Sequence, residues 1–399
     1  MITADEIAEK LASKDWRMRN MHQILPEDDA DGGLIPFVPR SEQEQHRRER
    51  HNRNFIPKAR KLGMSTDIVL DNMDECLVTA NTHCAIVDFR EEDAVKKLDI
   101  AKMNWNAGPH HPNPVIAEVW KRIHIENPLV ADTTERLKWS NGSKIEAGTS
   151  FMGGTPRRIH WSEAGPQSAQ APERARKVKR GTLNSLGANG IIDIETTMEG
   201  TEGTPARDIF DLALTMVGKT LTRMDWRLHF FPWYGHPSYD LPGHVPELPE
   251  TLAYAAEMQS KHGIILTPSR WAFYEKKKLE QKEDIWTQFP TIAEECIRTI
   301  ITGQIFPGMV TAKSQGRIRP LTIESRYPLF TFWDIGNDGL SAWLGQMPHR
   351  DICWHKFFLT TGKGAVEAVA QIQRWEQAIG RPIAKHFFPH DVDYRDKGY

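Results

Sequence analysis

The stretch Asn54-Phe-Ile-Pro-Lys-Ala-Arg-Lys-Leu-Gly-Met-Ser-Thr66 decides the fold. It has an apolar entry, a turn with a glycine at Gly63, a hydroxyl pair at Ser65 and Thr66, and then a helix that we expect over residues 67–77. This is the layout of a phosphate-binding loop (P-loop), in which backbone N–H groups at a helix start surround phosphate oxygens and a hydroxyl binds Mg²⁺. The stretch therefore predicts a strand, a P-loop and a helix in an α/β domain.

The loop departs from the usual GxxxxGK[ST] pattern at two positions. Lys58 stands in the place of the first glycine, and Met64 in the place of the lysine. Because charge neutralisation dominates phosphoryl transfer, we expect Lys58 and Arg60 to fold back over the phosphates. The residues expected to hold the nucleotide are Lys58, Ala59, Arg60, Lys61, Leu62, Gly63, Met64, Ser65 and Thr66. Taken alone, the motif is equally compatible with a basic turn before a helix.

A second motif supplies the acid that such a loop requires. Arg157-Arg-Ile-His-Trp-Ser-Glu-Ala164 predicts a short strand that ends in Ser162 and Glu163. An ATPase needs an acidic residue at a strand end to polarise the attacking water, so Glu163 is the expected general base. Ser162 stands where an aspartate usually bonds the Mg²⁺ shell, and its hydroxyl would do this weakly. The two motifs together predict ATP and Mg²⁺ as ligands.

A third strand is expected at Ile191-Ile-Asp-Ile194, followed by two hydroxyl residues. Thr196 and Thr197 could sense the γ-phosphate and pass the signal onward. The alternative is that these threonines reflect strand propensity alone.

Composition places limits on the remaining possibilities. The 399 residues are 39% apolar and 26% charged, as in folded soluble proteins, and no run approaches the roughly 18 apolar residues of a membrane span. The acidic, amphipathic N-terminus lacks the features of a secretory signal, so we expect an intracellular protein without membrane contact. The four cysteines form no CxxC pair, which argues against a zinc site or a disulfide framework.

Lysine and arginine gather in two runs although the net charge is -2. One run lies between Arg40 and Lys61, and the other covers Arg174, Arg176, Lys177, Lys179 and Arg180. Such runs can neutralise phosphates, but a solvated helix face is the more common interpretation of either run alone.

The order of apolar and polar segments predicts α/β units. Besides the strands above, we expect a strand at His83–Val87 and a hairpin over residues 137–145 that turns at Asn141-Gly142. The domains expected are an N-terminal helix and loop in 1–30, an ATPase domain in 31–302 with a helical part from about 201, a link in 303–328, and a second α/β domain in 329–399.

The second α/β domain is expected to hold strands at 329–333, 340–344, 352–358 and 384–388. A helix over Ala365–Ile379 is expected to pack through Val366, Val369, Ile372 and Ile379.

In this order, the motifs resemble the large terminase subunit of tailed bacteriophages, the motor that packages DNA into the capsid. The displaced Lys58, the Ser162-Glu163 strand end and Glu195-Thr196-Thr197 are similar to variants in that family. Phe37-Val-Pro-Arg-Ser-Glu-Gln43 looks like its adenine-reading segment, with Gln43 as the base contact. Three further stretches resemble family landmarks, namely 139–145, 229–233 and 288–295.

The resemblance implies a P-loop ATPase of the ASCE type, built on a central and mostly parallel sheet. It also implies double-stranded DNA as the cargo, a portal protein and a small terminase subunit as partners, a homo-oligomeric ring, and the host cytoplasm as the location. Met152-Gly153 occupies the place of a common Arg-Gly pair, which leaves Arg157 or Arg158 as the arginine expected to act on the γ-phosphate.

For the second domain, the resemblance implies an RNase H-like nuclease in which carboxylates hold two Mg²⁺ or Mn²⁺ ions. Asp334, with Asp338 nearby, resembles the first carboxylate, and Asp391 resembles the second. The family's third carboxylate comes later than Tyr399, so we expect an incomplete nuclease, in a fragment or in a truncated gene product. The alternative for Asp334 and Asp391 is a pair of turn aspartates.

Two other functions stay open on the sequence. A helicase-like ATPase without nuclease activity would need further motifs between residues 200 and 320. A nucleotide-binding structural module that does not hydrolyse ATP is compatible with Met64 and Ser162.

Overall fold

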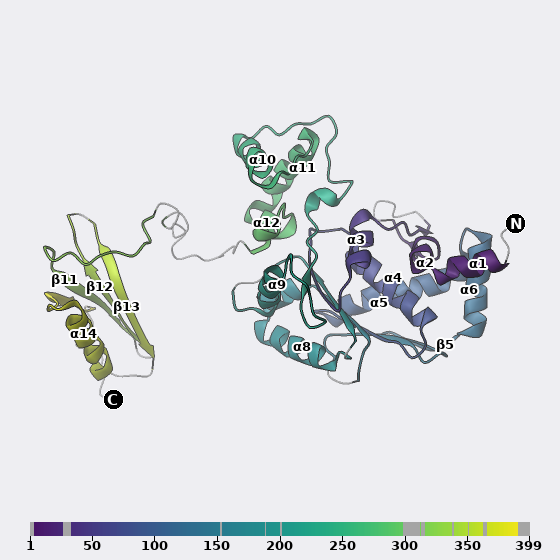
Figure 1. The fold of residues 1–399 in the computed structure, drawn as a ribbon, viewed down its shortest axis with the longest axis horizontal. Coiled ribbons are helices and arrows are strands. Elements are labelled where there is room, and N and C mark those ends of the chain that lie inside the picture. The colour runs from purple at the N-terminus through teal and green to yellow at the C-terminus, as the bar shows by residue number, and fades with distance from the viewer. Residues whose placement is uncertain are drawn as a thin grey trace. The chain divides into compact units, whose positions relative to one another are not determined.

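The computed structural model divides into two compact units, Met1–Ile301 and Thr302–Tyr399 (Figure 1). The structure describes residues 4–26, 33–151, 154–187, 189–199, 202–297, 312, 316–336, 339–349, 351–361 and 365–389. Within these residues, no helix has the length and apolarity needed to span a membrane.

The first unit is built on an eight-stranded sheet in the order β10-β3-β9-β8-β4-β7-β6-β5. The strands from β10 to β7 run parallel, and the hairpin strands β6 and β5 add antiparallel pairs at one edge. Their bounds are β3 Arg53–Pro57, β4 His83–Val87, β5 Leu129–Thr133, β6 Arg136–Trp139, β7 Lys144–Gly148, β8 Arg158–Ser162, β9 Ile191–Thr196 and β10 Arg227–Leu228. This mostly parallel α/β sheet confirms the predicted fold class.

Helices cover both faces of this sheet. Along β4 the side chains alternate, so that Cys84 and Ile86 join one buried cluster while Ala85 and Val87 join another. The first cluster includes residues of α4 (Met64–Val78), α5 (Glu91–Ala107) and α6 (Pro114–Glu126), and the second includes residues of α7 (Ala164–Gln170), α8 (Pro172–Ser185) and α9 (Pro205–Thr215). A strand that is apolar on both sides is what a parallel sheet between two helical layers requires.

A third layer of contacts joins the P-loop to a helical part of the same unit. This part comprises α10 (Pro249–His262), α11 (Pro268–Gln281) and α12 (Ile285–Gln288). Tyr254 and Trp271 of this part, together with Trp233 from the segment before α10, form one buried cluster with Ala59, Leu62 and Met64 of the loop. The remaining elements of the unit are α1 (Ala4–Ala12), α2 (Lys14–Asn20), α3 (Ser41–Glu49) and the short paired strands β1 (Gln23–Ile24) and β2 (Ile35–Pro36).

The predicted strands of this unit are confirmed with small shifts of their ends. β4 has the predicted bounds, β8 ends at Ser162 next to Glu163 as predicted, and β9 continues beyond Ile194 to Thr196. The hairpin turns at Gly142, whose φ of 84° is accessible to glycine at little cost.

The first basic run is divided between surface and interior: Arg48, Arg60 and Lys61 are exposed, whereas two of its arginines are paired inside the unit. Arg47 of α3 pairs with Asp67 of α4, and Arg50, which directly follows α3, pairs with Asp71. Arg158 of β8 also reaches Asp71, at 2.7 Å. For these arginines, neither phosphate binding nor a solvated helix face is therefore correct. Their acidic partners, Asp67 and Asp71, lie one helical turn apart on α4, a spacing that places both carboxylates on the same side of the helix.

The second unit is a four-stranded sheet in the order β13-β12-β11-β14 with the helix α14 (Ala365–Ile379). The strands are β11 (Leu329–Ile335), β12 (Gly339–Gln346), β13 (Cys353–Thr361) and β14 (Lys385–Phe387). These elements confirm the predicted ones, and Ile372 and Ile379 of α14 pack in the core as predicted, but the other two predicted core residues do not. Val366 and Val369 are exposed, whereas Ala368, Ile372 and Trp375 are buried, since Trp375 buries the larger apolar surface at a compatible helical spacing.

Candidate active site

Three neighbouring parallel strands end at one edge of the large sheet and bring the predicted site residues together. Lys58 follows β3, Glu195 lies near the end of β9, and Glu163 follows β8. β9 lies between the other two strands, with Pro57 paired to Thr196 and Ser162 paired to Glu195. The carboxyl ends of parallel strands share one edge, where α/β proteins commonly bind ligands.

Glu195 is the centre of this cluster and is fully buried. Its Oε2 lies 3.1 Å from Nζ of Lys58. Its Oε1 accepts hydrogen bonds of 2.6 Å from the hydroxyls of both Ser65 and Ser162. The Nε2 of His160 is 3.4 Å from the same oxygen. One carboxylate thus connects the P-loop to the strand that precedes the predicted base.

The charges of this cluster stabilise one another. Burial alone would raise the pKa of Glu195, but the Lys58 ammonium and the other donors hold that pKa well below its ordinary value. Burial would lower the pKa of Lys58, and the two nearby carboxylates raise it above its ordinary value. Lys58 and Glu195 therefore form a buried and charged ion pair.

Glu163 has the environment and the backbone expected of a general base. Burial, the largest effect, raises its pKa above the ordinary 4.5; Lys58 opposes this and the Glu195 carboxylate adds to it. Its φ of 53° and ψ of 42° lie in the left-handed region, which a residue with a side chain seldom adopts outside functional sites. Its backbone N–H donates to the carbonyl of Glu195 at 2.9 Å, which holds this conformation.

The loop itself presents unused donors. Lys61 and Gly63 have φ values of 58° and 69°, and these turn the chain into the start of α4. Among the described residues, no acceptor bonds the backbone N–H groups of residues 61 to 65. Free N–H groups at a helix start beside a lysine are a suitable environment for phosphate oxygens.

Gln43 lies against the loop, and its amide is occupied on both sides. Its Oε1 accepts from the backbone N–H of Arg40 at 2.8 Å, and its Nε2 donates to the carbonyl of Gly63 at 2.9 Å. The side chain therefore braces the loop in this structure, and a role as base contact would require these bonds to be exchanged.

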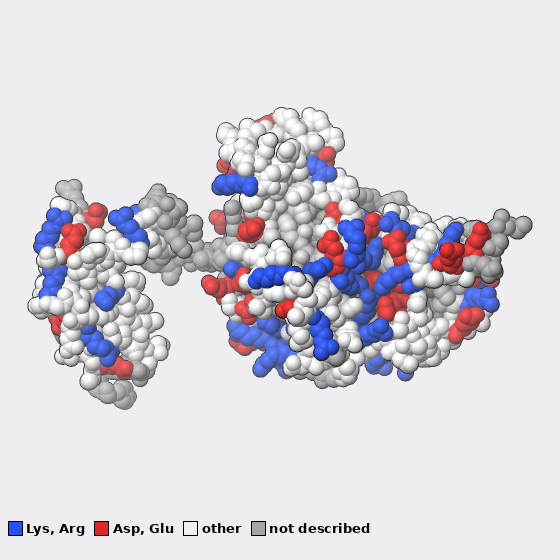
Figure 2. Space-filling view, in the orientation of Figure 1, with Lys and Arg blue, Asp and Glu red and all other residues white. Residues whose placement is uncertain are grey.

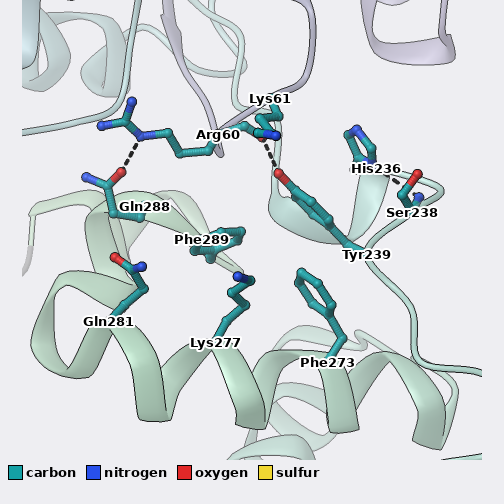
Figure 3. A pocket seen from close by; sticks show the side chains of 10 residues that line it. All are labelled: Arg60, Lys61, His236, Ser238, Tyr239, Phe273, Lys277, Gln281, Gln288 and Phe289. Carbon is teal, nitrogen blue, oxygen red and sulfur yellow. Dashed lines mark hydrogen bonds between the residues drawn. The ribbon is translucent and has the colours of Figure 1, made fainter. Parts of the chain in front are cut away.

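An open pocket of about 570 Å³ adjoins the outer side of the loop (Figure 3). In this view Arg60 and Lys61 lie above it, and Phe273 and Lys277 of α11 lie below it. Arg60 donates to the side chain of Gln288, and its carbonyl accepts from the Tyr239 hydroxyl at 2.9 Å. The lining combines aromatic rings, three cations and two amides: Arg60, Lys61, His236, Ser238, Tyr239, Phe273, Lys277, Gln281, Gln288 and Phe289. Both its size and this mixture are typical of small-molecule sites.

The predicted coupling residues lie between the base and the lysine. Thr196 receives the backbone N–H of Gly165 on its hydroxyl at 2.8 Å, and its carbonyl accepts from the N–H of Lys58. The hydroxyl of Thr197 is 3.4 Å from Oε2 of Glu163.

The two arginines considered for the γ-phosphate do not reach this edge. Arg157 and Arg158 stand at the amino end of β8, whereas the cluster lies at its carboxyl end. Arg158 is buried and bonded to Asp71. Arg157 lies 3.8 Å from Glu75. Neither can act on a phosphate in this arrangement, because parallel strands hold their two ends at opposite edges of the sheet.

Of the three candidate nuclease carboxylates, Asp334 alone belongs to the described residues. Asp334 is exposed in β11, opposite Ser341 of β12. Asp338 and Asp391 lie outside the described residues. Where the structure is described, no group of three or more His, Cys, Asp and Glu side chains could hold a metal ion.

Sequence reasoning did not select Glu195 as a site residue. A signal was present, because a charged residue in an apolar strand such as Ile191-Ile-Asp-Ile-Glu-Thr196 must find partners when it is buried. Its partners come from β3, α4 and β8, which only the strand order identifies.

The chain is similar to several solved large terminases of bacteriophages. The HK97 large terminase shares 12% identity at a TM-score of 0.45, covering 94% of this chain and 74% of that protein. The large terminase of the thermophilic bacteriophage D6E, also solved with ADP and with ATP-gamma-S, shares 10% identity at 0.36, covering 90% and 79%. The large terminase ATPase domain of Thermus phage P74-26 shares 12% identity at 0.36, covering 56% and 89%.

All of these TM-scores lie below 0.5, a level at which likeness alone establishes neither fold nor function. No family model matches the chain, and no curated protein is similar to it.

Proposed function

We propose that this chain is the ATP-hydrolysing large subunit of a phage DNA-packaging terminase. One observation carries the proposal: the buried Glu195 carboxylate joins Lys58, the P-loop hydroxyl of Ser65 and the strand end of Ser162 at a single edge of the sheet. Burying a charged side chain costs folding free energy unless close partners compensate it, so buried charges concentrate at functional sites. Here every partner comes from a motif associated with nucleotide hydrolysis.

In the proposed complex, the triphosphate lies on the free N–H groups of residues 61 to 65. Lys58 neutralises phosphate charge from the start of the loop, and Arg60 does so from its exposed outer side. The N–H groups and the lysine are fixed before the ligand binds, so their electrostatic effect requires little reorganisation. Glu163 accepts the proton of the attacking water, since its raised pKa brings its basicity closer to neutrality.

The donor set also fits Mg²⁺. Ser65, Ser162 and Glu195 supply hydroxyl and carboxylate oxygens, the ligands that this ion prefers, and Mg²⁺ is commonly bound by few protein groups together with substrate phosphates. When bound, the ion would neutralise charge that develops on the phosphate oxygens. Glu195 in turn holds both serine hydroxyls in place.

We further propose that the pocket beside Arg60 receives the base of the nucleotide. It adjoins the loop that would hold the phosphates, and its aromatic rings offer apolar contact to a base. Gln43 would then support the base indirectly, by fixing the carbonyl of Gly63.

The coupling residues would report hydrolysis to the rest of the motor. Thr196 accepts a hydrogen bond from the first turn of α7, and Thr197 contacts Glu163. A movement of the Glu163 side chain would therefore displace the residues at the end of β9. The further elements of the proposal are translocated double-stranded DNA, a ring on the portal protein, delivery of DNA by a small subunit, location in the host cytoplasm, and a metal-dependent nuclease in the second unit around Asp334, Asp338 and Asp391.

A non-hydrolysing nucleotide-binding module is the second candidate. It is favoured by the ion pair of Lys58 with Glu195, because a lysine that is held by a protein carboxylate has less charge available to a phosphate. It predicts binding of ATP without turnover.

Steady-state ATP hydrolysis with Mg²⁺ separates the two candidates. We expect turnover by the wild type, and a loss of about 10² to 10⁴ in kcat for Glu163→Gln with nucleotide binding retained. Glu118→Gln, on the exposed surface of α6, is the matched control and should leave kcat unchanged. Nucleotide binding without wild-type turnover would support the second candidate, and equal kcat for wild type and Glu163→Gln would refute Glu163 as the base.

A further inference from the structure

The second basic run lies on one helix, α8, which has a charged outer face. Its inner face is buried through Ala175, Val178 and Thr182. After the exposed Glu173 in the first turn, the exposed charged positions of the next two turns are all basic: Arg174, Arg176, Lys177 and Arg180. Figure 2 shows lysine and arginine gathered over the position that α8 has in Figure 1.

Other surface helices of this unit mix their charges. On α6, Lys121 pairs with Glu118 and Arg122 with Glu126. On α11, Lys277 pairs with Glu280. Ordinary solvated faces are balanced in this way, and they have little net attraction for a polyanion.

On α8 this balance is absent. Arg176 pairs with Glu173, and the less exposed Lys179 lies 3.5 Å from Asp208. Among the described residues, Arg174, Lys177 and Arg180 have no acidic partner within ion-pair distance. Since the whole chain carries a net charge of -2, this excess is local and not a property of the overall composition.

We propose that the outer face of α8 binds the phosphate backbone of double-stranded DNA, an inference that rests on the proposed function. A helix rises about 1.5 Å per residue, so Arg174 to Arg180 covers about 9 Å. Each strand of a duplex carries a phosphate every ~3.4 Å of its axis, so this length corresponds to about three phosphates. Arginine side chains suit such contacts, because the guanidinium can bond two phosphate oxygens at once.

The place of α8 in the fold connects this face to the hydrolysis site. Ala171 alone separates α8 from α7, and α7 begins directly after Glu163. A Cβ on Gly165 would stand 2.2 Å from the carbonyl oxygen of Thr197, so the first turn of α7 packs directly against the residue that follows β9. A change in the backbone at Glu163 would therefore be passed to α8 through one short and closely packed helix.

Fluorescence anisotropy with a labelled 30-base-pair duplex, at salt concentrations from 50 to 200 mM, tests the proposal. The test variant is Arg174→Gln/Lys177→Gln/Arg180→Gln. The matched control removes three exposed charges elsewhere, as Lys121→Gln/Arg122→Gln/Lys138→Gln. The slope of log K against log salt is negative, and if three phosphate contacts are lost it should become less negative by about 2 to 3. The control should keep the wild-type slope.

Charge-preserving substitution guards against a loss of folding. Arg174→Lys/Arg180→Lys should retain the wild-type slope, and the DNA-free ATPase of the triple variant should match the wild type. Equal slopes for the triple variant and the wild type would overturn the proposal, and so would equal weakening by the control. Displacement of the duplex by an unrelated acidic protein as readily as by unlabelled duplex would overturn the choice of DNA. Absence of ATP turnover in the wild type would refute the proposed function instead, while the salt slopes would still report on α8.

Discussion

Two regions of this molecule place a carboxylate near the end of a strand, with different results. In the first unit, Glu195 lies near the end of a strand with parallel neighbours on both sides, so Lys58 after β3 and Ser162 at the end of β8 meet it. In the second unit, Asp334 lies on β11, whose neighbours are the antiparallel β12 and the short parallel β14. An antiparallel neighbour brings its amino end to that edge, so fewer strand ends converge there.

The surroundings of the two carboxylates differ accordingly. Glu195 is fully buried and bonded to a lysine and two serines, whereas Asp334 is exposed. An acidic residue near the end of a strand thus acquires partners through the order and direction of the neighbouring strands, which bring donors from distant segments of the chain to it.

The largest expected effect is on stability, and it contrasts the two carboxylates directly. Glu195→Gln removes the partner of the buried Lys58, and leaving a buried charge unpaired typically costs about 3 to 5 kcal/mol. Asp334→Asn, at an exposed position, should change stability by less than about 0.5 kcal/mol. Calorimetric unfolding of both variants measures this difference. Equal destabilisation would mean that burial of Glu195 does not distinguish the two sites.

Acid should weaken the first unit more than the second. His229 is buried, and burial lowers its pKa from 6.5 to about 3. Below pH 6.5 this histidine is protonated in the unfolded chain but stays neutral in the folded chain. The free energy of unfolding therefore decreases as the pH falls from 6.5 toward 3. At pH 5 the loss approaches about 2 kcal/mol for one such histidine.

His229→Asn should remove the share of this acid sensitivity that His229 contributes, while the buried His22 and His46, whose pKa values burial also lowers, keep theirs. Urea unfolding of the wild type and the variant at pH 7.5 and pH 5 is the appropriate measurement. In the second unit His355 is only partly buried, and the half-exposed position predicts a smaller response for His355→Asn. The same pH dependence in His229→Asn and wild type would contradict the assignment.

A smaller effect concerns the pH profile of hydrolysis. A base acts only when ionised, so kcat should fall about tenfold for each pH unit below the raised pKa of Glu163. The acidic limb should therefore lie above pH 4.5, the ordinary value for a glutamate. A residual rate of Glu163→Gln that shows the same limb would assign the limb to another group.

The smallest effect is expected for DNA cleavage by the second unit. Two metal ions need several clustered carboxylates, and Asp334 has no such cluster among the described residues. Cutting of plasmid with Mn²⁺ by the 399-residue chain should be weak or absent, and Asp334→Ala should change it little. Robust cutting that Asp334→Ala abolishes would show that further ligands complete the site.

Much of the fold could be predicted from local patterns. The strand, glycine turn and helix around Gly63, the β8 strand end and the hairpin at Asn141-Gly142 each rest on residues adjacent in sequence, and each was found where expected. The bounds of α14 were likewise predicted, but its buried face only in part: Ile372 and Ile379 pack inward as expected, whereas Trp375 is buried in place of the two valines.

Long-range pairing was beyond local patterns. The partners lie far apart in sequence: Arg47 and Asp67 are separated by 20 residues, and Lys58 and Glu195 by 137. Polar residues in an apolar strand signal that partners exist, yet only the order of strands in the sheet identifies them.

The central claim is that a triphosphate binds between Lys58 and Glu163, and calorimetric titration tests it most directly. ATP and inorganic tripolyphosphate, each with Mg²⁺, would be titrated into the wild type, Lys58→Gln and the exposed control Lys96→Gln. Binding of both ligands by the wild type and the control, with a loss of about tenfold or more in Lys58→Gln, is the predicted result. Unchanged affinity of Lys58→Gln for both ligands would contradict the account.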